Sequence, residues 1–404
     1  MQKLKTIYLS RLAAVPRSIW ALGIVSMFMD LSSELIHSLL PIFMVSTLGT
    51  SIAAVGLVEG IAEATANIVK IFSGTLSDYF GKRKLLVVIG YGLAALTKPL
   101  FPLANTVNVT LMARFIDRIG KGIRGAPRDA MISDIAAQEI RGTCFGLRQS
   151  LDTVGAILGP LLAIGGMLLF SGNIRNVLWL AVIPAFMSVA ILAFGVKEPP
   201  AHHPEQTGVK IQIRSISQIG ATYWKLVMMS GLFTLARFSE AFLILKAQEI
   251  GLSFAFIPVI LIVMNIVYAL GAYPSGVLSD NINRKTVLII GMFFLIAADI
   301  ILGIGNNLFM LLLGTVLWGL YLAFSQGTLT TMITDTSPPA LRGTAYGIYN
   351  FICGIVMLIA SILAGILWDQ YGSAVTFFAG IIFTLIALLS LLFIPSKPFL
   401  PIKK

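Results

Sequence analysis

The chain has 404 residues, of which 57% are hydrophobic and 12% are charged, and its mean hydropathy is +0.90. A soluble globular protein carries about 25% charged residues, so the composition excludes an ordinary soluble domain and indicates a polytopic membrane protein. The net charge of +11 fits the Lys and Arg enrichment of cytoplasmic loops, and we expect no nucleic-acid partner because no soluble basic domain is present to bind one.

Twelve apolar stretches are each long enough to cross a bilayer, which takes about 20 residues of helix. The sequence therefore predicts an all-α polytopic membrane protein with twelve transmembrane helices. The expected spans are 19–46, 52–76, 85–103, 108–130, 143–170, 176–196, 223–248, 254–278, 286–304, 308–333, 344–367 and 374–394.

Two motifs recur at nearly one offset. The segment Gly74–Lys84 (GTLSDYFGKRK) returns 202 residues later as Gly276–Lys285 (GVLSDNINRK), and segment 134–143 returns 201 residues later as 335–344. Because a segment with an acid and several cations cannot lie in hydrocarbon, we expect the first motif to form a water-facing loop. The repeat predicts two related halves: an N-terminal six-helix bundle (1–196), a cytoplasmic linker (197–222) and a C-terminal six-helix bundle (223–404).

Loop charge predicts the orientation. Lys and Arg gather in the N-terminal segment, the central linker and alternate loops, whereas only Arg175 lies clearly in the loops of the other side. The positive-inside rule then places both termini and the linker in the cytoplasm. The first sixteen residues are basic and polar, and the apolar run after them is too long for a cleavable signal peptide. We expect a multi-pass protein of a bacterial inner (plasma) membrane.

Ionisable residues fall inside the first two predicted spans, where each costs about 2.5–3.5 kcal/mol. Their spacings of three and four residues put those of each span on one helical face. Two acidic faces are too many for lipid, so we expect them to line a watery cavity and to handle protons or ligand; the alternative is that they pair with buried cations and lock helices together. They are Asp30, Glu34 and His37 in the first span, and Glu59, Glu63 and Lys70 in the second, where the amide of Asn67 lies on the same face.

The fourth span carries a basic stripe with one acid, and Arg118 lies beside it. The stripe consists of Arg114, Asp117, Lys121, Arg124 and Arg128. The planar fork of arginine suits carboxylates and phosphates. For Arg114 and Arg118 we expect coupling or contact with an anion. For Arg124 and Arg128 we favour a structural role, in which they pair with nearby acids and headgroups. The segment GKGIRG (120–125) is not a dinucleotide-binding loop, because no strand precedes it.

The second half offers a smaller polar set. Ser239-Glu240 repeats Ser33-Glu34 at an offset of 206, and Arg237 lies three residues before Glu240 on the same face. Uncharged polar and aromatic residues of the eighth and tenth spans can hydrogen-bond to or stack on an organic ligand, with packing as the alternative. They are Asn265, Tyr268, Trp318, Tyr321 and Gln326.

Three signatures resemble those of the major facilitator superfamily of secondary transporters. The first is G-x-L-[SA]-D-x-x-G-[KR]-[KR], matched by Gly74, Leu76, Ser77, Asp78, Gly81, Lys82 and Arg83. The second is R-x-x-x-G in the fourth helix, matched by Arg118 and Gly122. The third is similar to the antiporter signature G-x8-G-x3-G-P, matched by Gly146, Gly155, Gly159 and Pro160, although the closing G-G follows late; packing of small residues also explains this spacing.

The resemblance covers the whole chain and implies two pseudo-symmetric bundles around a central cavity that opens by alternating access. It implies that Glu34 and Glu240 face one another across the centre, and it associates Arg118 with proton coupling. It also implies a cytoplasmic gate that joins the halves when the cavity opens outward. The residues expected in this gate are Gly74, Asp78, Gly81, Arg83, Asp134, Arg141, Asp280, Lys285, Asp335 and Arg342.

These observations predict a proton-coupled transporter of a small organic solute, with efflux by antiport favoured. The alternative is a transporter of an organic anion, such as a polycarboxylate or siderophore, that imports or facilitates. An enzyme is not expected, because the chain has no H-E-x-x-H or G-x-S-x-G motif and its three histidines form no metal set within the membrane. A receptor would not need two acidic helix faces. The expected partners are a small-molecule substrate, protons and the lipid bilayer, with a monomeric chain and no cofactor.

Overall fold

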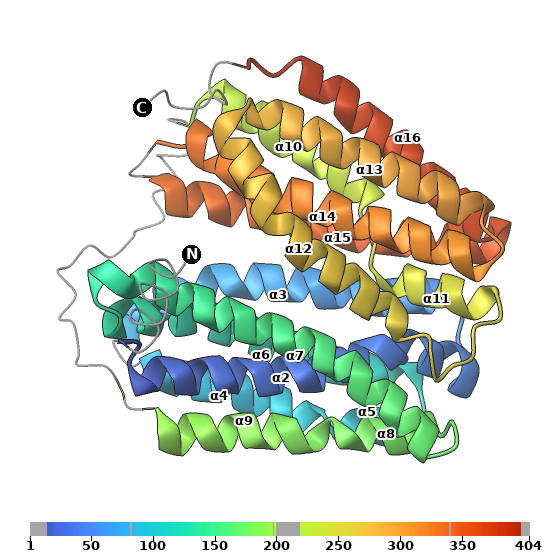
Figure 1. Ribbon diagram of the computed structural model, residues 1–404, viewed down its shortest axis with the longest axis horizontal. Coiled ribbons are helices and arrows are strands. Elements are labelled where there is room, and N and C mark those ends of the chain that lie inside the picture. The colour runs from blue at the N-terminus through green and yellow to red at the C-terminus, as the bar shows by residue number, and fades with distance from the viewer. Residues whose placement is uncertain (1–13, 81–82, 197, 199–218, 339–340, 397–404) are drawn as a thin grey trace, which may run out of the picture. The chain divides into compact units, whose positions relative to one another are not determined.

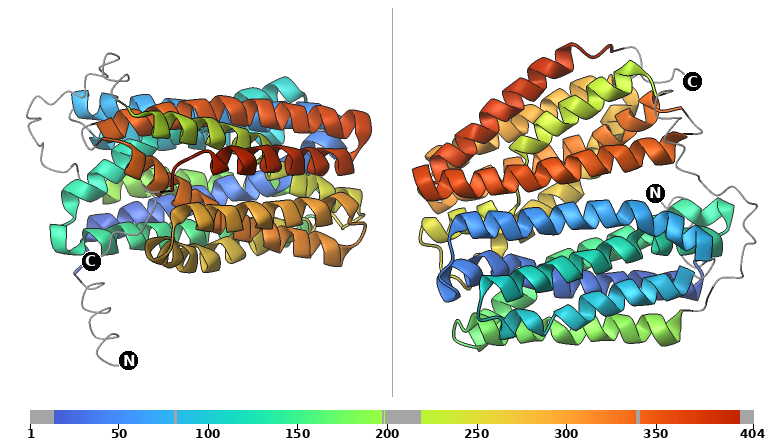
Figure 2. Two further views of the ribbon diagram at one scale, coloured as in Figure 1. Left: turned by 90° about the horizontal axis from the view of Figure 1, so that it is seen from above. Right: turned by 180° about the vertical axis from the view of Figure 1, so that it is seen from behind.

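Figure 1 shows a computed structural model of the chain, which describes residues 14–80, 83–196, 198, 219–338 and 341–396. All regular structure in these ranges is helical. Most of the predicted linker 197–222, and Gly81 of the first motif, lie outside the described residues. Figure 2 shows the same helices from two further directions.

The helices confirm the predicted fold class and the positions of all twelve spans. Eleven spans are long and apolar enough to cross a membrane, and α6 has the length but carries the basic stripe. In chain order the elements are α2 (Arg17–Ile42) with the π-helical turn Phe43–Thr47, α3 (Ile52–Phe80), α4 (Arg83–Thr97) with α5 (Leu100–Leu103), α6 (Val107–Ile135), the 3-10 turn Gln138–Ile140, α7 (Arg141–Leu169), α8 (Ile174–Leu180) with α9 (Val182–Gly195), α10 (Ala221–Ala236) with α11 (Ala241–Glu249), α12 (Val259–Asn281), α13 (Arg284–Ile304), α14 (Leu308–Thr336), α15 (Arg342–Tyr371) and α16 (Ser373–Leu392).

The predicted loop in each copy of the first motif is mostly helix, which corrects our expectation. Helix α3 continues to Phe80 and α4 begins at Arg83, while α12 continues to Asn281 and α13 begins at Arg284. A single glycine costs a helix only about 1 kcal/mol, and neither motif contains proline, so the helices continue through the motifs. Their charged residues therefore lie at helix ends rather than in a long loop.

The helices divide into two units. Unit 1 contains residues 1–39 and 65–210, and unit 2 contains residues 40–64 and 211–404. Within unit 1, α4 packs against α6 and α9, and a Cβ on Gly90 would lie 2.7 Å from the carbonyl oxygen of Gly120. This close approach requires glycine and holds α6, which carries the basic stripe, firmly against α4.

Unit 2 contains the beginning of α3 as well as α10 to α16. The carboxylate of Asp369, near the end of α15, accepts hydrogen bonds from the backbone N–H groups of Ile52 (3.0 Å) and Ala53 (2.8 Å). Nearby, a Cβ on Gly60 would lie 3.0 Å from the carbonyl oxygen of Leu358. Residues 40–64 thus belong to unit 2, whereas we predicted them in the N-terminal bundle. The division into bundles 1–196 and 223–404 stays a prediction.

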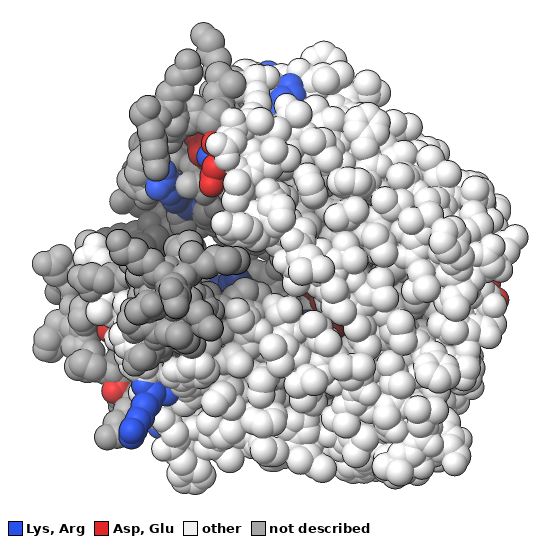
Figure 3. Space-filling view, in the orientation of Figure 1, with Lys and Arg blue, Asp and Glu red and all other residues white. Residues whose placement is uncertain are grey.

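The outer surface suits a bilayer. Large apolar side chains such as Phe194, Leu169 and Phe309 are 92%, 74% and 73% exposed. The face in Figure 3 shows few charged side chains over its broad white area. Because such a surface in water would be unfavourable, it indicates contact with lipid.

Candidate functional site

The basic stripe of α6 turns inward within unit 1. Arg114, Asp117, Arg118 and Arg124 are 1%, 3%, 4% and 4% exposed, whereas Lys121 is exposed. The guanidinium of Arg124 lies 4.5 Å from the centre of the Tyr91 ring, a cation–π distance. Arg124 is thus held inside the protein rather than among headgroups, although a structural role for it remains our prediction.

Asp117 has a partner that the sequence analysis missed. Lys98, between α4 and α5, donates to the carboxylate of Asp117 at 2.8 Å and to the hydroxyl of Ser33 at 3.0 Å. Both charged side chains are nearly fully buried. Lys98 is therefore the hydrogen-bonded partner of the one acid of the stripe.

The acidic face of α2 lies against α7. Nδ1 of His37 lies 3.6 Å from Oε2 of Glu34, as the spacing of three residues suggests, and Asp30 is half-buried on the same helix. A Cβ on Gly159 would lie 2.6 Å from the carbonyl oxygen of Leu31 and 2.9 Å from Cβ of Glu34. Gly159 thus lets α7 touch the backbone of α2 beside the Glu34–His37 pair.

The other residues of the glycine signature differ in their surroundings. Gly155 also packs against α2, with its missing Cβ 3.2 Å from Cβ of Asp30, and Pro160 is buried in α7. Gly146 has no atom within 4 Å of the position of its missing Cβ. Only the second and third glycines of the signature therefore form a close helix contact.

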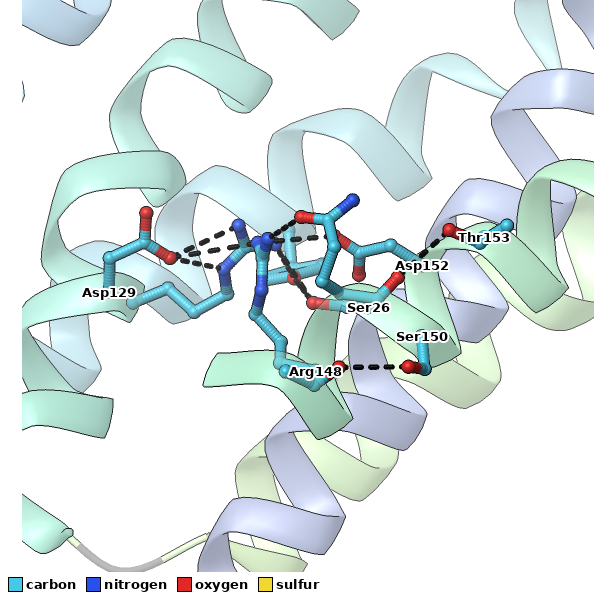
Figure 4. A network of polar contacts seen from close by, with 10 residues as sticks. Ser26, Asp129, Arg148, Ser150, Asp152 and Thr153 are labelled. Atoms are coloured by element: carbon cyan, nitrogen blue, oxygen red, sulfur yellow. Dashed lines mark hydrogen bonds and ion pairs between the residues drawn. The ribbon is translucent and has the colours of Figure 1, made fainter. Parts of the chain in front are cut away.

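A polar network connects α2, α6 and α7 in unit 1. Figure 4 shows Arg148 between Asp129 and Asp152, at 3.7 Å and 3.1 Å. Arg128 completes this network with a bond of 2.9 Å to the hydroxyl of Ser26 and a contact with Asp129. Arg148 and Asp152 are four residues apart on α7, so their pair forms along one helix.

The polar residues of α3 are distributed over both units. Glu59 is 1% exposed, and Glu63 and Asn67 are half-buried. Glu59 and Glu63 belong to the part of α3 in unit 2, and Asn67 belongs to unit 1. The helix therefore continues from one unit into the other between the second acid and the amide.

Unit 2 has its charged site at a break in a span. Helix α10 ends at Ala236 and α11 begins at Ala241, so Arg237 lies in non-helical backbone with φ −98° and ψ 50°. Its guanidinium lies 5.6 Å from the ring centre of Phe233 and 6.0 Å from that of Tyr321. Glu240 is half-buried at the other end of the same break. The predicted helical face shared by Arg237 and Glu240 is therefore absent, because the chain leaves the helix between them.

Aromatic residues surround this break. Trp318 and Tyr321 of α14 are 0% and 2% exposed, and their ring centres lie 5.3 Å apart. The ring of Tyr321 also meets that of Phe233 at 6.4 Å. On α12, Asn265 is half-buried, and the hydroxyl of Tyr268 bonds to Oε1 of Gln326 at 3.2 Å. The structure thus brings Trp318 and Tyr321 into one aromatic group and Tyr268 and Gln326 into one pair.

A second residue missed by the sequence analysis is Asp299 of α13. Its carboxyl group is fully buried, and neither oxygen has a hydrogen-bond donor within the described ranges. A Cβ on Gly380 would lie 2.5 Å from Oδ2 of Asp299, so glycine makes room for the carboxyl group. In the sequence, Asp299 has no charged neighbour at helical spacing. The one feature that could have indicated it is an acid within an apolar span.

The repeated motifs form equivalent ion pairs. Arg83 pairs with Asp134 in unit 1, and Arg284 pairs with Asp335 at 2.8 Å in unit 2. The next lysine in each copy donates to backbone oxygens: Lys84 to Ala193 at 2.9 Å, and Lys285 to Ile394 at 3.0 Å. Arg284, which was absent from the predicted gate, is thus the counterpart of Arg83.

The remaining gate residues lie at helix ends. Asp280, Arg141 and Arg342 are exposed, and Arg141 donates to the carbonyl of Ser133 at 3.2 Å. Gly74 and Asp78 lie in the last turns of α3. Their role as a gate stays a prediction.

Comparison with known proteins gives one family. The sequence profile of the Major Facilitator Superfamily (MFS) matches residues 22–245 and 226–404. An uncharacterized MFS-type transporter of Methanocaldococcus jannaschii is 33% identical over 386 residues, which cover 94% of this chain and 95% of that protein. The cis,cis-muconate transport protein of Acinetobacter baylyi is 24% identical over 311 residues, which cover 72% of this chain and 73% of that protein.

The fold has solved counterparts. The crystal structure of a bacterial homologue of the human lysosomal transporter Spinster, in an inward-facing and unoccupied conformation, superposes with a TM-score of 0.76. The match covers 95% of this chain and 97% of that chain at 16% identity. At 16% identity, this similarity shows only that the two proteins share a fold.

Proposed function

Because the chain belongs to the Major Facilitator Superfamily, and is therefore a multi-pass membrane transporter rather than an enzyme, we propose that it moves a small organic anion in exchange or symport with protons. Transport proceeds by alternating access, as the two-half architecture of such transporters implies. This proposal selects the organic-anion alternative of the sequence analysis over an unspecified organic solute.

The charge of α6 carries the proposal. Among the residues of unit 1 that the structure describes, the buried charged side chains are four cations and one acid: Lys98, Arg114, Arg118, Arg124 and Asp117. Lys98 pairs with Asp117, and α6 adds three buried arginines to its one buried acid. Burying charge at membrane depth is costly, so a cluster of buried arginines on one helix is a candidate site for an anionic solute.

The chemistry of the arginines indicates the class of anion. A guanidinium presents a planar fork that matches a carboxylate with two parallel hydrogen bonds. A relative at 24% identity is named for transport of cis,cis-muconate, which is a dicarboxylate. Both observations favour carboxylates among the possible anions.

The Glu34–His37 pair supports proton coupling. A carboxyl group and an imidazole 3.6 Å apart can hold and release a proton between them, and histidine changes charge near physiological pH in many proteins. The pair lies beside Gly159, where α7 packs closely against the backbone of α2. Protonation of the pair would thus change the charge at the place where α2 and α7 pack closely together.

The test is uptake of succinate and cis,cis-muconate into proteoliposomes with an imposed pH gradient. We expect uptake that depends on the gradient, and a loss of about tenfold or more in Arg118→Gln, the size expected when a hydrogen bond to a charged group is removed. Arg17→Gln, which removes an exposed cation at the start of α2, should transport normally. Equal transport by wild type and Arg118→Gln would refute the role of α6.

A second candidate for the direction is export by proton antiport. The close contact of Gly155 and Gly159 with α2 favours it, because these residues match the antiporter-like signature of α7. Inverted vesicles test this candidate directly: an antiporter accumulates the anion when the interior is acidic. Accumulation with an acidic exterior would instead assign symport.

A further inference from the structure

The break at residues 237–240 leaves polar backbone inside a membrane span. The span extends from Ala221 to Glu249, and its two helices stop on either side of Arg237 and Glu240. Non-helical backbone at membrane depth is tolerated where it is buried in protein or lines a watery site, and broken helices commonly bind the cargo of transporters. The break is therefore a place to look for a ligand.

Arg237 differs in its partners from Lys246 and Arg284, two buried cations of unit 2 that form ion pairs. Lys246 pairs with Glu249 at 2.9 Å, and Arg284 pairs with Asp335 at 2.8 Å. Arg237 makes no ion pair with a carboxylate anywhere in the described ranges, and its buried Nε has no hydrogen-bond acceptor there. The rings of Phe233 and Tyr321 lie beside its guanidinium, which also bonds to the side chain of Tyr321 and lies near Tyr349 and Cys353. A cation at membrane depth without a counter-ion is costly, so a bound anion would stabilise it.

A second buried donor supports a ligand in the same aromatic group. Nε1 of Trp318 is buried and has no acceptor within the part of the chain described. Its ring lies 5.3 Å from that of Tyr321, which in turn faces Arg237. Buried polar groups nearly always find a partner. Two unsatisfied donors around one tyrosine therefore indicate that this group receives an acceptor from outside the chain.

We propose that Arg237 binds the carboxylate of an aromatic or conjugated organic acid, whose planar body lies against the edge of the ring group formed by Phe233, Tyr321 and Trp318. The flat carboxylate fits the guanidinium fork, and a flat unsaturated body makes the offset or edge contacts that aromatic rings prefer. A phosphate fits less well, because it is strongly hydrated and Phe233 offers it no donor. This inference rests on the proposed function, since it names the class of anion that is carried.

The experiment is binding of benzoate to the purified full-length protein, followed by tryptophan fluorescence and by thermal stability. Cyclohexanecarboxylate tests the need for a flat ring, and benzyl alcohol tests the need for the charge. We expect saturable binding of benzoate and weaker binding of both analogues. Arg237→Gln should weaken benzoate about 10- to 100-fold, the effect of losing a hydrogen bond to a charged group. Lys225→Gln, at an exposed lysine of α10, should bind as wild type.

The outcomes separate this inference from the proposed function. Unchanged benzoate affinity in Arg237→Gln, or equal binding of benzyl alcohol, overturns the inference. If Arg237→Gln does not fold, Arg237→Lys keeps the charge and loses the fork, and wild-type affinity in that variant also overturns it. Succinate transport that depends on Arg118 without any benzoate binding refutes the inference and leaves the proposed function standing. Absence of transport for every carboxylate refutes the proposed function itself.

Discussion

The Nζ atom of Lys98 lies 2.8 Å from Oδ1 of Asp117, with 1% and 4% of the two side chains exposed. The pair joins the end of α4 to the middle of α6, and Ser33 of α2 accepts a further hydrogen bond from the same ammonium group. Three helices of unit 1 thus meet at one lysine. Because removing one member of a buried pair leaves an uncompensated charge, this contact makes a clear prediction.

Lys98→Met should destabilise the protein by about 3–5 kcal/mol, because Asp117 is then buried without its partner. The double variant Lys98→Met/Asp117→Leu should recover most of that loss, since a buried pair replaced by apolar residues is often nearly neutral. Thermal unfolding in detergent measures both. A double variant as unstable as the single one would show that the pair itself, and not the stranded acid, determines stability.

Gly159→Ala should impair transport, because the new Cβ would lie 2.6 Å from the carbonyl oxygen of Leu31 and would push α7 away from α2. Gly146→Ala is the matched control on the same helix, where the new Cβ has no neighbour within 4 Å. That variant should gain up to about 1 kcal/mol of stability from the better helix former. Transport rates and thermal unfolding of the two variants provide the comparison. Similar effects at both positions would contradict the packing account.

Asp335→Asn should lower the transport rate and change stability by less than about 1 kcal/mol, because Asp335 is part of a partly exposed ion pair. The exchange variant Arg284→Asp/Asp335→Arg should restore part of the rate if the 2.8 Å contact between these residues matters. Lys285→Gln should have a smaller effect, since Lys285 bonds to backbone oxygens instead. If Lys285→Gln is as damaging as Asp335→Asn and the exchange restores nothing, the assignment of Arg284 as the functional partner is wrong.

Asp299→Asn should leave the stability within about 1 kcal/mol of wild type, because neither carboxyl oxygen accepts a hydrogen bond from the described residues. The amide has nearly the same shape and fits the space beside Gly380. Gly380→Ala is the contrasting change and should be destabilising, since the added Cβ would lie 2.5 Å from Oδ2 of Asp299. A large loss of stability in Asp299→Asn would show that the ionised carboxylate has a favourable partner.

The fold could be predicted because eleven of the twelve spans are long apolar runs and each half repeats the same motifs. Local spacing also predicted that Glu34 and His37 share one face of their helix, and these side chains lie 3.6 Å apart. Such pairs share one helix, so the period of the helix is enough to place them. The family signatures were similarly visible because they are contiguous in the chain.

Contacts between helices were harder to predict. Lys98 and Asp117 are 19 residues apart on different helices, and nothing in their spacing indicates a buried pair. Asp299 is a lone acid in an apolar span, and its surroundings depend on how α13 rotates towards Gly380. Arg284 was missed because the GxLSD letters align at an offset of 202 residues, whereas the ion pairs of the two copies align at 201. These cases depend on helix rotation and register, which a single sequence does not reveal.

The hydrogen bonds from two backbone N–H groups to Asp369 affect whether the protein can be assembled from two separate fragments. Ile52 and Ala53 precede the central linker, yet they pack with α15, which follows it. A protein expressed as two pieces divided within residues 199–218 would therefore leave the first turn of α3 in one polypeptide and its cap in the other. Reassembly of the pieces would require α3 to regain Asp369, so Asp369→Ala should weaken complementation between fragments more than it weakens the intact chain, where covalent linkage keeps the partners together.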